Sequence, residues 1–250
     1  MKRIIAALFA LSLSVFAADK KPLLLVLTNH AELGETGKPT GFYLSEAAHP
    51  HEVFTKAGYK VKLASPEGGF APLDPKSLEL EDEANAAFWK NFGNGDKDKP
   101  GVAETMALSD VGPGEYGGIF FAGGHGSMWD FPASAELRAV TASIYSRGGV
   151  VGAVCHGPAA LVNLKLPDGS LLVSGKKVAV FTNEEEEKVE LTEVVPFLLQ
   201  TAFEDMGAEI VPAEAFSENA VRDGRLVTGQ NPASAKKAAQ LFVEGLTAED

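Results

Sequence analysis

The chain has 250 residues, of which 45% are hydrophobic and 8% aromatic, a composition typical of one large globular domain with its own core. Its formal net charge of −12 argues against nucleic-acid backbones and anionic membranes as partners. A single cysteine excludes an internal disulfide.

The first 17 residues have the pattern of an export signal. Lys2 and Arg3 form a basic start, residues 4–16 are mainly apolar, and Ala17 ends an acceptable cleavage site. The apolar run is short for a bilayer span, although an uncleaved anchor stays an alternative. We therefore expect residues 18–250 to be a single mature domain, exported to the periplasm or secreted and free of the membrane after cleavage. An unused leader would leave the protein cytoplasmic.

Strand-like and helix-like segments alternate along the rest of the chain. A helix is expected to begin at Gly157-Pro158, because proline fits the first helical turn. This alternation predicts an α/β fold of the flavodoxin-like, doubly wound type, with a mostly parallel sheet and helices on both faces. The other expected strands are 22–28, 59–64, 118–122, the apolar run before Cys155, 177–182, 209–211 and 225–228, and the other expected helices are 45–57, 133–146, 191–206 and 233–246.

Residues 66–114 interrupt this alternation and are too long for a simple connection. Long insertions of this kind are either functional or surface additions. Two interpretations stay open. The segment is functional, either as a cap over the active site or as a dimer surface, or it is a surface insertion without a role in the site.

Cys155 falls on the turn between a buried strand and a helix, in the run Ala153-Val154-Cys155-His156-Gly157-Pro158. Such a turn lifts its side chain clear of the sheet, as a nucleophile elbow does. The helix start and His156 favour thiolate, so we expect a nucleophile with a depressed pKa. The alternative is a small buried hydrophobic residue, the commoner fate of a free cysteine.

Ligands of doubly wound sheets bind beyond the carboxyl ends of the strands. The turn 123–126, Gly-Gly-His-Gly, follows an expected strand but is no dinucleotide fingerprint, because Trp129 stands at the third glycine position. Backbone N–H groups near Gly124 could stabilise an oxyanion, with His125 lining the pocket; an ordinary turn is the alternative.

Several further acidic and histidine residues are ambiguous by sequence. Glu46 has the place of a helix-start acid, and residues 184–187 have the pattern of a solvated charge run, unless one carboxylate orients His156. His49 and His51 are metal-ligand types, but their spacing matches no zinc signature, and we expect no metal.

The positions of the five histidines exclude two familiar active sites, because none of the five follows His156. An α/β-hydrolase triad needs a histidine after its nucleophile. A true class I glutamine amidotransferase places a His-x-Glu pair well downstream of its cysteine.

The motif around Cys155, together with residues 122–126, resembles the ThiJ/PfpI superfamily, which has the class I glutamine amidotransferase-like fold. The adjacent Cys-His pair, the insertion, Phe181-Thr182-Asn183-Glu-Glu and residues 228–232 are similar to its heat-shock chaperone/glyoxalase III branch. The resemblance covers roughly residue 21 to the last helix.

The resemblance implies a role for each matching residue. Glu186 best matches the third member of the catalytic triad, with Glu185 as the alternative register. Cys155 matches the nucleophile and His156 its partner. Glu46 matches the acid that hydrogen-bonds the cysteine, and the backbone near Gly124, beside His125, matches the oxyanion site.

The resemblance also implies an activity that needs no cofactor. We expect a glutathione-independent glyoxalase III that converts methylglyoxal, a small reactive aldehyde, to lactate through a cysteine hemithioacetal, acts in carbonyl stress and forms a homodimer. A protein or nucleotide deglycase would use the same chemistry. The alternative is an envelope holdase that uses exposed apolar surface around Phe88, Trp89 and Phe92; a closed pocket over Cys155 would favour the enzyme.

Overall fold

The structure is a computed structural model that describes residues 20–248. The expected signal peptide, residues 1–17, lies outside the described residues. Within 20–248, no helix has both the length and the apolar character needed to cross a membrane.

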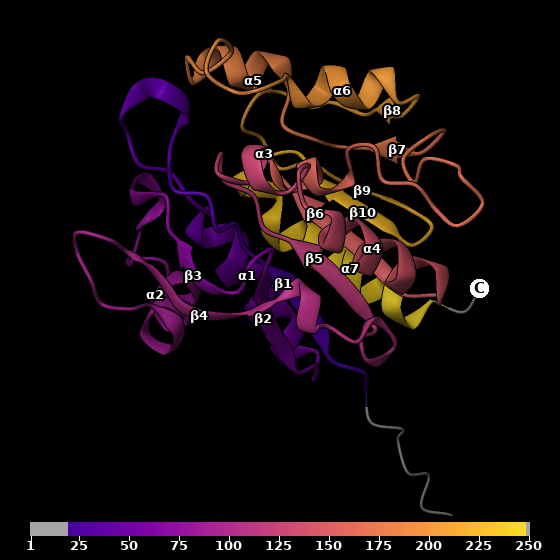
Figure 1. The fold of residues 1–250 in the computed structure, drawn as a ribbon, viewed down its shortest axis with the longest axis horizontal. Helices are drawn as coiled ribbons and strands as arrows, with labels where there is room; N and C mark the ends of the chain where they lie inside the picture. The colour runs from indigo at the N-terminus through magenta and orange to yellow at the C-terminus, as the bar shows by residue number, and fades with distance from the viewer. Residues whose placement is uncertain (1–19, 249–250) are drawn as a thin grey trace, which may run out of the picture.

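An eight-stranded sheet forms the centre of the described chain (Figure 1). Its strand order is β3-β4-β2-β1-β5-β6-β10-β9, and all neighbours are parallel except the two edge pairs β3-β4 and β10-β9. The strands are β1 (Leu23–Val26), β2 (Val61–Ser65), β3 (Gly69–Pro72), β4 (Gly101–Ala107), β5 (Gly118–Phe121), β6 (Val150–Val154), β9 (Ala220–Asp223) and β10 (Leu226–Gly229).

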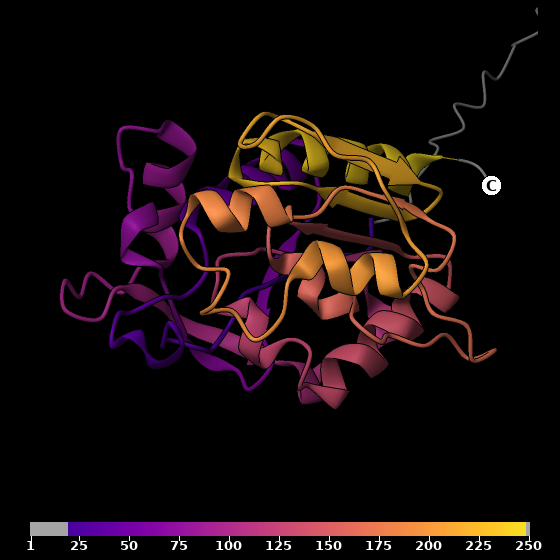
Figure 2. The same ribbon diagram turned by 90° about the horizontal axis from the view of Figure 1, so that it is seen from above.

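Helices cover both faces of this sheet (Figure 2). Phe120 and Phe121 are neighbours in β5, so their side chains point to opposite faces. Phe120 packs against Phe54 and Phe242, which lie on α1 and α7, whereas Phe121 packs against Phe131 on the other face. The expected doubly wound fold is confirmed. The helices are α1 (Leu44–Lys56), α2 (Glu83–Phe92), α3 (Ser127–Asp130), α4 (Ala135–Ser146), α5 (Asn183–Lys188), α6 (Leu199–Asp205) and α7 (Ala235–Thr247).

Three expected elements are shorter than the sequence predicted. The segment after Cys155 is a 3-10 helix, η5 (Gly157–Leu161), and the expected helix 191–206 is only α6. Pro196 explains the second difference, because proline and the residue before it disfavour a helix interior. The expected strand 177–182 is reduced to β7 (Lys177–Val178), which pairs with β8 (Glu209–Ile210). It ends there because the Ala179 N–H donates to the Thr228 hydroxyl and not to a backbone carbonyl of a neighbouring strand.

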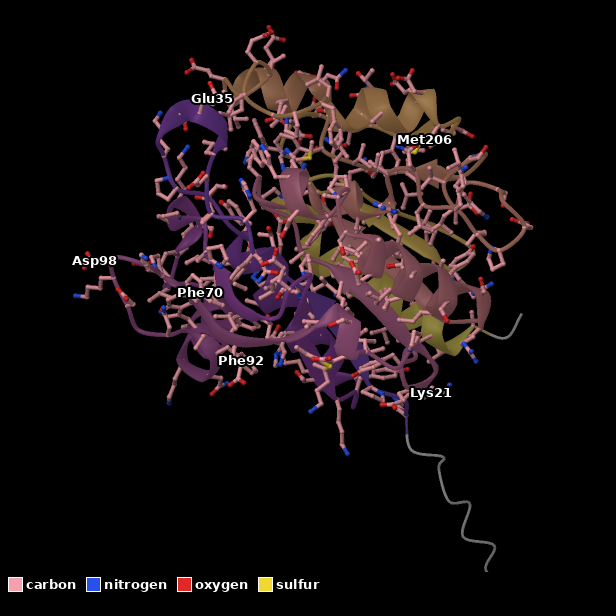
Figure 3. All side chains as sticks on the ribbon, viewed as in Figure 1. Lys21, Glu35, Phe70, Phe92, Asp98 and Met206 are labelled. Carbon is pink, nitrogen blue, oxygen red and sulfur yellow. The ribbon has the colours of Figure 1, made fainter. Side chains whose placement is uncertain are left out.

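The insertion 66–114 supplies β3, β4 and α2, so it extends the sheet at one edge. Helix α2 packs on α1, where His51 contacts the rings of Phe88 and Phe92 edge-on; Figure 3 labels Phe92 on this helix. Phe88 is only 2% exposed, and Trp89 and Phe92 are half-buried. The apolar surface expected of a holdase is therefore largely used in packing these helices together.

Candidate active site

Cys155 occupies a strained turn directly after β6. Its φ of 59° lies in the left-handed region, which costs a non-glycine residue free energy and is typical of functional sites. Two backbone hydrogen bonds hold the turn: the Cys155 N–H donates to the Gly229 oxygen at 2.9 Å, and the Phe181 N–H donates to the Cys155 oxygen at 3.2 Å. The ends of β6 and β10 and the segment that follows β7 therefore fix the position of the turn that carries the sulfur.

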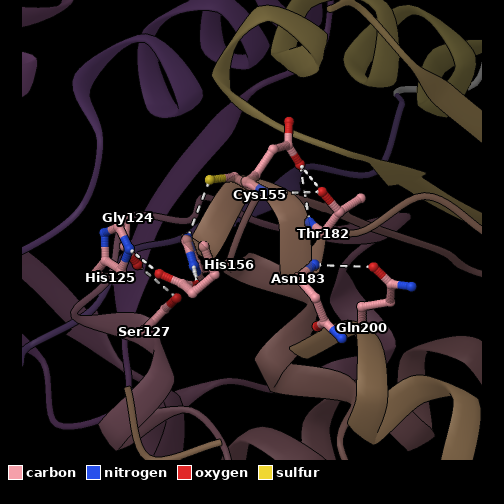
Figure 4. Close-up of polar contacts among 10 residues, drawn as sticks. Gly124, His125, Ser127, Cys155, His156, Thr182, Asn183 and Gln200 are labelled. Carbon is pink, nitrogen blue, oxygen red and sulfur yellow. Dashed lines mark hydrogen bonds and ion pairs between the residues drawn. The ribbon is translucent and has the colours of Figure 1, made fainter. Parts of the chain in front are cut away.

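His156 lies beside the thiol, with Nδ1 3.3 Å from Sγ (Figure 4). Its Nε2 is 2.8 Å from Glu186 Oε2. Burial acts to raise the pKa of Glu186, but His156 and His125 outweigh it and lower that pKa to about 2. An ionised carboxylate can only accept, so Nε2 carries the proton and Nδ1 is free to accept one from the thiol. Burial and the adjacent His125 lower the pKa of His156, which keeps the imidazole neutral at pH 7.

The second oxygen of Glu186 binds a second histidine. Oε1 lies 3.0 Å from His125 Nε2, and the two imidazole rings are 4.1 Å apart. His125 reaches this position from the Gly-Gly-His-Gly turn after β5. One carboxylate on α5 thus orients two imidazoles that come from two strand ends.

Glu46 lies in the first turn of α1, close to the cysteine, and is fully buried. Its Oε2 accepts from the Gly123 N–H at 2.8 Å, and the carboxyl lies close enough to the Cys155 thiol for each group to shift the pKa of the other. Among the described residues, Oε1 has no nitrogen or oxygen partner. Burial raises the pKa of Glu46 to about 8, so this carboxyl is mostly protonated at pH 7.

The turn after β5 brings backbone N–H groups to the sulfur. Gly124 has a φ of 98°, and a Cβ there would overlap the Gly41 carbonyl oxygen, so only glycine fits. The Gly124 N–H lies close enough to the Cys155 sulfur to lower the pKa of the thiol, while the Gly124 oxygen accepts from the Ser127 hydroxyl at 2.9 Å (Figure 4). This N–H is placed to donate to an oxygen that develops beside the sulfur.

Glu185, the alternative register for the triad, points away from His156. It forms a capping box with Thr182, and its Oε1 accepts from the Phe216 N–H at 2.7 Å and from Asn231 Nδ2 at 2.8 Å. The spacing Thr182-x-x-Glu185 is the sequence signal that marks this residue as a helix cap, and it could have separated Glu185 from Glu186.

The expectation of a depressed cysteine pKa is wrong. Burial, and after it the Glu46 carboxyl, raises the pKa of the Cys155 thiol well above its ordinary value. The following element is a five-residue 3-10 turn instead of a full helix, so its dipole offsets little of this cost. His156 Nδ1, 3.3 Å from the sulfur, is placed to accept the thiol proton, so a reaction at Cys155 would not need the thiol to be ionised beforehand.

A cavity of about 260 Å³ opens onto this cluster. Cys155, His156, His125 and Gly124 line its inner end. Phe181 and Pro232 of the motifs 181–185 and 228–232 also line the cavity, and the rest of the lining comes from residues that carried no sequence signal: Leu33, Lys38, Pro39, Tyr43, Asp74, Lys76, Val189, Leu191 and Phe216.

His49 and His51 have separate partners, because His49 Nε2 lies 3.2 Å from Asp82 Oδ2 and His51 packs against aromatic rings. Within residues 20–248, the one cluster of metal-ligand types is His125, His156 and Glu186. In this cluster the Glu186 carboxylate is already hydrogen bonded to His156 Nε2 at 2.8 Å and to His125 Nε2 at 3.0 Å.

Comparison with known proteins finds relatives that match most of the chain. The chain is 37% identical over 234 residues to Glyoxalase 3 of Candida albicans, which covers 87% of this chain and 95% of that protein. It is 33% identical to glutathione-independent glyoxalase HSP31 of Saccharomyces cerevisiae, with 92% and 99% covered. The crystal structure of Candida albicans glyoxalase III superposes with a TM-score of 0.80 at 34% identity, covering 90% and 96% of the two chains.

A second solved structure, the Rapid Encystment Protein 24 KDa of Francisella tularensis, has a TM-score of 0.83 and 36% identity, covering 91% of this chain and all of that one. Residues 39–245 match the DJ-1/PfpI family. The match spans most of the domain and includes Glu46, Cys155 and Glu186. The chain belongs to the DJ-1/PfpI family.

Proposed function

We propose that this protein is a glutathione-independent glyoxalase of the glyoxalase III type, which converts methylglyoxal to lactate. The observation that carries the proposal is the position of Cys155 between two different proton carriers. His156 Nδ1 lies 3.3 Å from the sulfur, and the buried Glu46 carboxyl lies close enough to the thiol to raise its pKa. The names of the relatives support the same reaction.

The first step is addition of the thiol to the aldehyde carbon, C1. The S–H proton passes to His156 Nδ1, Sγ forms a bond to C1, and the carbonyl electron pair moves onto oxygen. The Gly124 N–H is placed to stabilise that oxygen before it takes a proton, which gives a hemithioacetal.

The second step moves hydrogen between the two oxidised carbons. Ionised Glu46 removes the proton from C1 while His156 relays the proton of the C1 hydroxyl to the ketone oxygen at C2, giving an enediolate. Glu46 then returns its proton to C2, and the C1 oxygen becomes the carbonyl of a lactoyl thioester, with no external oxidant or reductant. A carboxyl with a pKa near 8 suits this role, because it both accepts and returns a proton close to neutral pH.

Hydrolysis completes the cycle. Water adds to the thioester carbonyl and gives a proton to His156, the carbon–sulfur bond breaks, and the departing sulfur takes that proton from His156. Glu186 stays ionised throughout, since its pKa is about 2, and keeps Nδ1 of His156 facing the sulfur.

The test is lactate formation from methylglyoxal without added glutathione. We expect the wild type to form lactate and Cys155→Ala to form none above the uncatalysed rate. Lactate formation by the wild type that persists in Cys155→Ala would sink the proposal.

Export and self-association are proposals that rest on the sequence alone. We propose that a leader is removed after Ala17 and that the mature protein is a homodimer. Mass spectrometry of protein from its native cells, and its mass by light scattering, test the two points.

A further inference from the structure

The cavity above Cys155 is larger than methylglyoxal requires. Methylglyoxal has three carbons and two oxygens, and at about 30 Å³ for each water-sized atom it occupies roughly 150 Å³ or less. The cavity holds about 260 Å³. Space for several more atoms is therefore left beyond the reacting carbons.

One side of this extra space is apolar and aromatic. Phe181 stacks close to His156, with ring centroids 4.2 Å apart, and the Phe216 ring lies 6.3 Å further along. Val189 and Leu191 line the same side. Phe216 is 45% exposed, which is unusual for a side chain of its size and gives a bound apolar group a surface to cover.

The backbone of Phe216 is in a strained conformation. Its φ of 63° is unfavourable for an aromatic residue, yet its N–H donates to the fully buried Glu185 at 2.7 Å. A strained, exposed aromatic residue that a buried carboxylate fixes at the rim of a pocket is consistent with a role in binding.

The rim of the cavity also has a cationic side. Lys38 and Lys76 are both exposed, and neither forms an ion pair with a carboxylate of residues 20–248. Asp74 also lines the cavity, but its oxygens accept from the Thr40 hydroxyl and from the Lys76 backbone N–H. Two side-chain ammonium groups thus lie at the entrance of a cavity in a strongly acidic chain.

We propose that the preferred substrates are α-oxoaldehydes with an aromatic or branched apolar body and an anionic group at the far end. The reacting aldehyde lies at Cys155, the body lies against Phe181 and Phe216, and the anion lies between Lys38 and Lys76. This assignment rests on the glyoxalase activity proposed above and names its substrate class.

The first test compares kcat/KM for methylglyoxal, phenylglyoxal and 4-carboxyphenylglyoxal. We expect phenylglyoxal to exceed methylglyoxal by about tenfold, since the ring buries five more carbons, and the carboxylate to add a further factor of about three to ten. An equal or higher kcat/KM for methylglyoxal would overturn the assignment.

The second test removes the two charges with Lys38→Gln/Lys76→Gln. Intrinsic aldehyde reactivity cancels in the ratio of kcat/KM for carboxyphenylglyoxal to that for phenylglyoxal, and we expect this ratio to fall about threefold to tenfold. The matched control is Lys62→Gln/Lys90→Gln, two exposed lysines away from the cavity that change the net charge equally. An unchanged ratio in the first variant, or an equal fall in the control, would refute the role of the rim.

Calorimetric binding of the hydroxy-acid products separates this inference from the activity on which it rests. 4-Carboxymandelate should bind more tightly than mandelate, and mandelate more tightly than lactate. This order without turnover of any aldehyde would refute the glyoxalase proposal and support the pocket assignment. Turnover of all three aldehydes at equal kcat/KM would support the glyoxalase proposal and refute the pocket assignment.

Discussion

The two sides of Cys155 each hold a buried glutamate, and the two carboxyls have opposite charge states. Glu46, on α1, meets one backbone N–H and a neutral thiol, and burial raises its pKa to about 8. Glu186, on α5, is also buried, but two imidazoles outweigh the burial and its pKa is about 2. The partners of a buried carboxyl, more than its depth, therefore decide whether it carries protons or stays charged.

We expect the largest loss of activity when the titratable carboxyl of Glu46 is removed. We expect Glu46→Gln to keep the fold and lower kcat by about 1,000-fold, because the amide cannot accept a proton from C1. The wild-type kcat should rise with pH around a midpoint near 8, as Glu46 ionises, and this step should vanish in the variant. Near-normal turnover by Glu46→Gln would leave Glu46 a buried structural acid.

The Glu186 side should respond less, because Glu186 acts on the substrate through His156. We expect Glu186→Gln to lower kcat about 100-fold, since an amide no longer enforces the tautomer with a free Nδ1. KM should change little, because Glu186 does not line the cavity. A loss confined to KM would contradict this positioning role.

The sequence predicted these residues unevenly, and the reasons are physical. The buried strand 22–28, the helix 45–57 and the turn at Cys155 were predictable because apolar periodicity and Gly-Pro signals are local. The helix at 191–206 failed because Pro196 divides it. Glu46 gives no local sign of its role, since its burial depends on Gly123, which is distant in the chain.

The outer wall of the cavity was not predictable in the same way. Lys38, Lys76 and Phe216 come from three loops, and only the closed fold brings them to one rim. The position of Phe216 further depends on a hydrogen bond to Glu185, a residue that the sequence could not separate from its neighbours without the capping-box spacing.

The pH dependence of stability gives a smaller test of the same contrast. A raised pKa means that the folded state holds the Glu46 proton more tightly than the unfolded chain does. The stability that this provides is present below pH 4.5 and is lost as pH rises through about 8. We expect Glu46→Gln to gain about 4 kcal/mol relative to wild type between pH 5 and pH 9 in urea unfolding, because its amide does not ionise. A constant difference between the two proteins would show that Glu46 is already ionised when folded.

The smallest expected effect separates Glu185 from its neighbours in the run 184–187. Glu185→Gln should reduce stability by about 1 to 3 kcal/mol, because one amide cannot satisfy donors from Thr182, Phe216 and Asn231. Chemistry at Cys155 should continue, since Glu185 does not contact His156, while binding of arylglyoxals weakens as Phe216 loses its anchor. Glu184→Gln and Glu187→Gln are the controls: both residues are exposed, and each variant should stay within about 0.5 kcal/mol of wild type. Equal losses at all three positions would mean that net charge, and not the hydrogen bonds of Glu185, governs this segment.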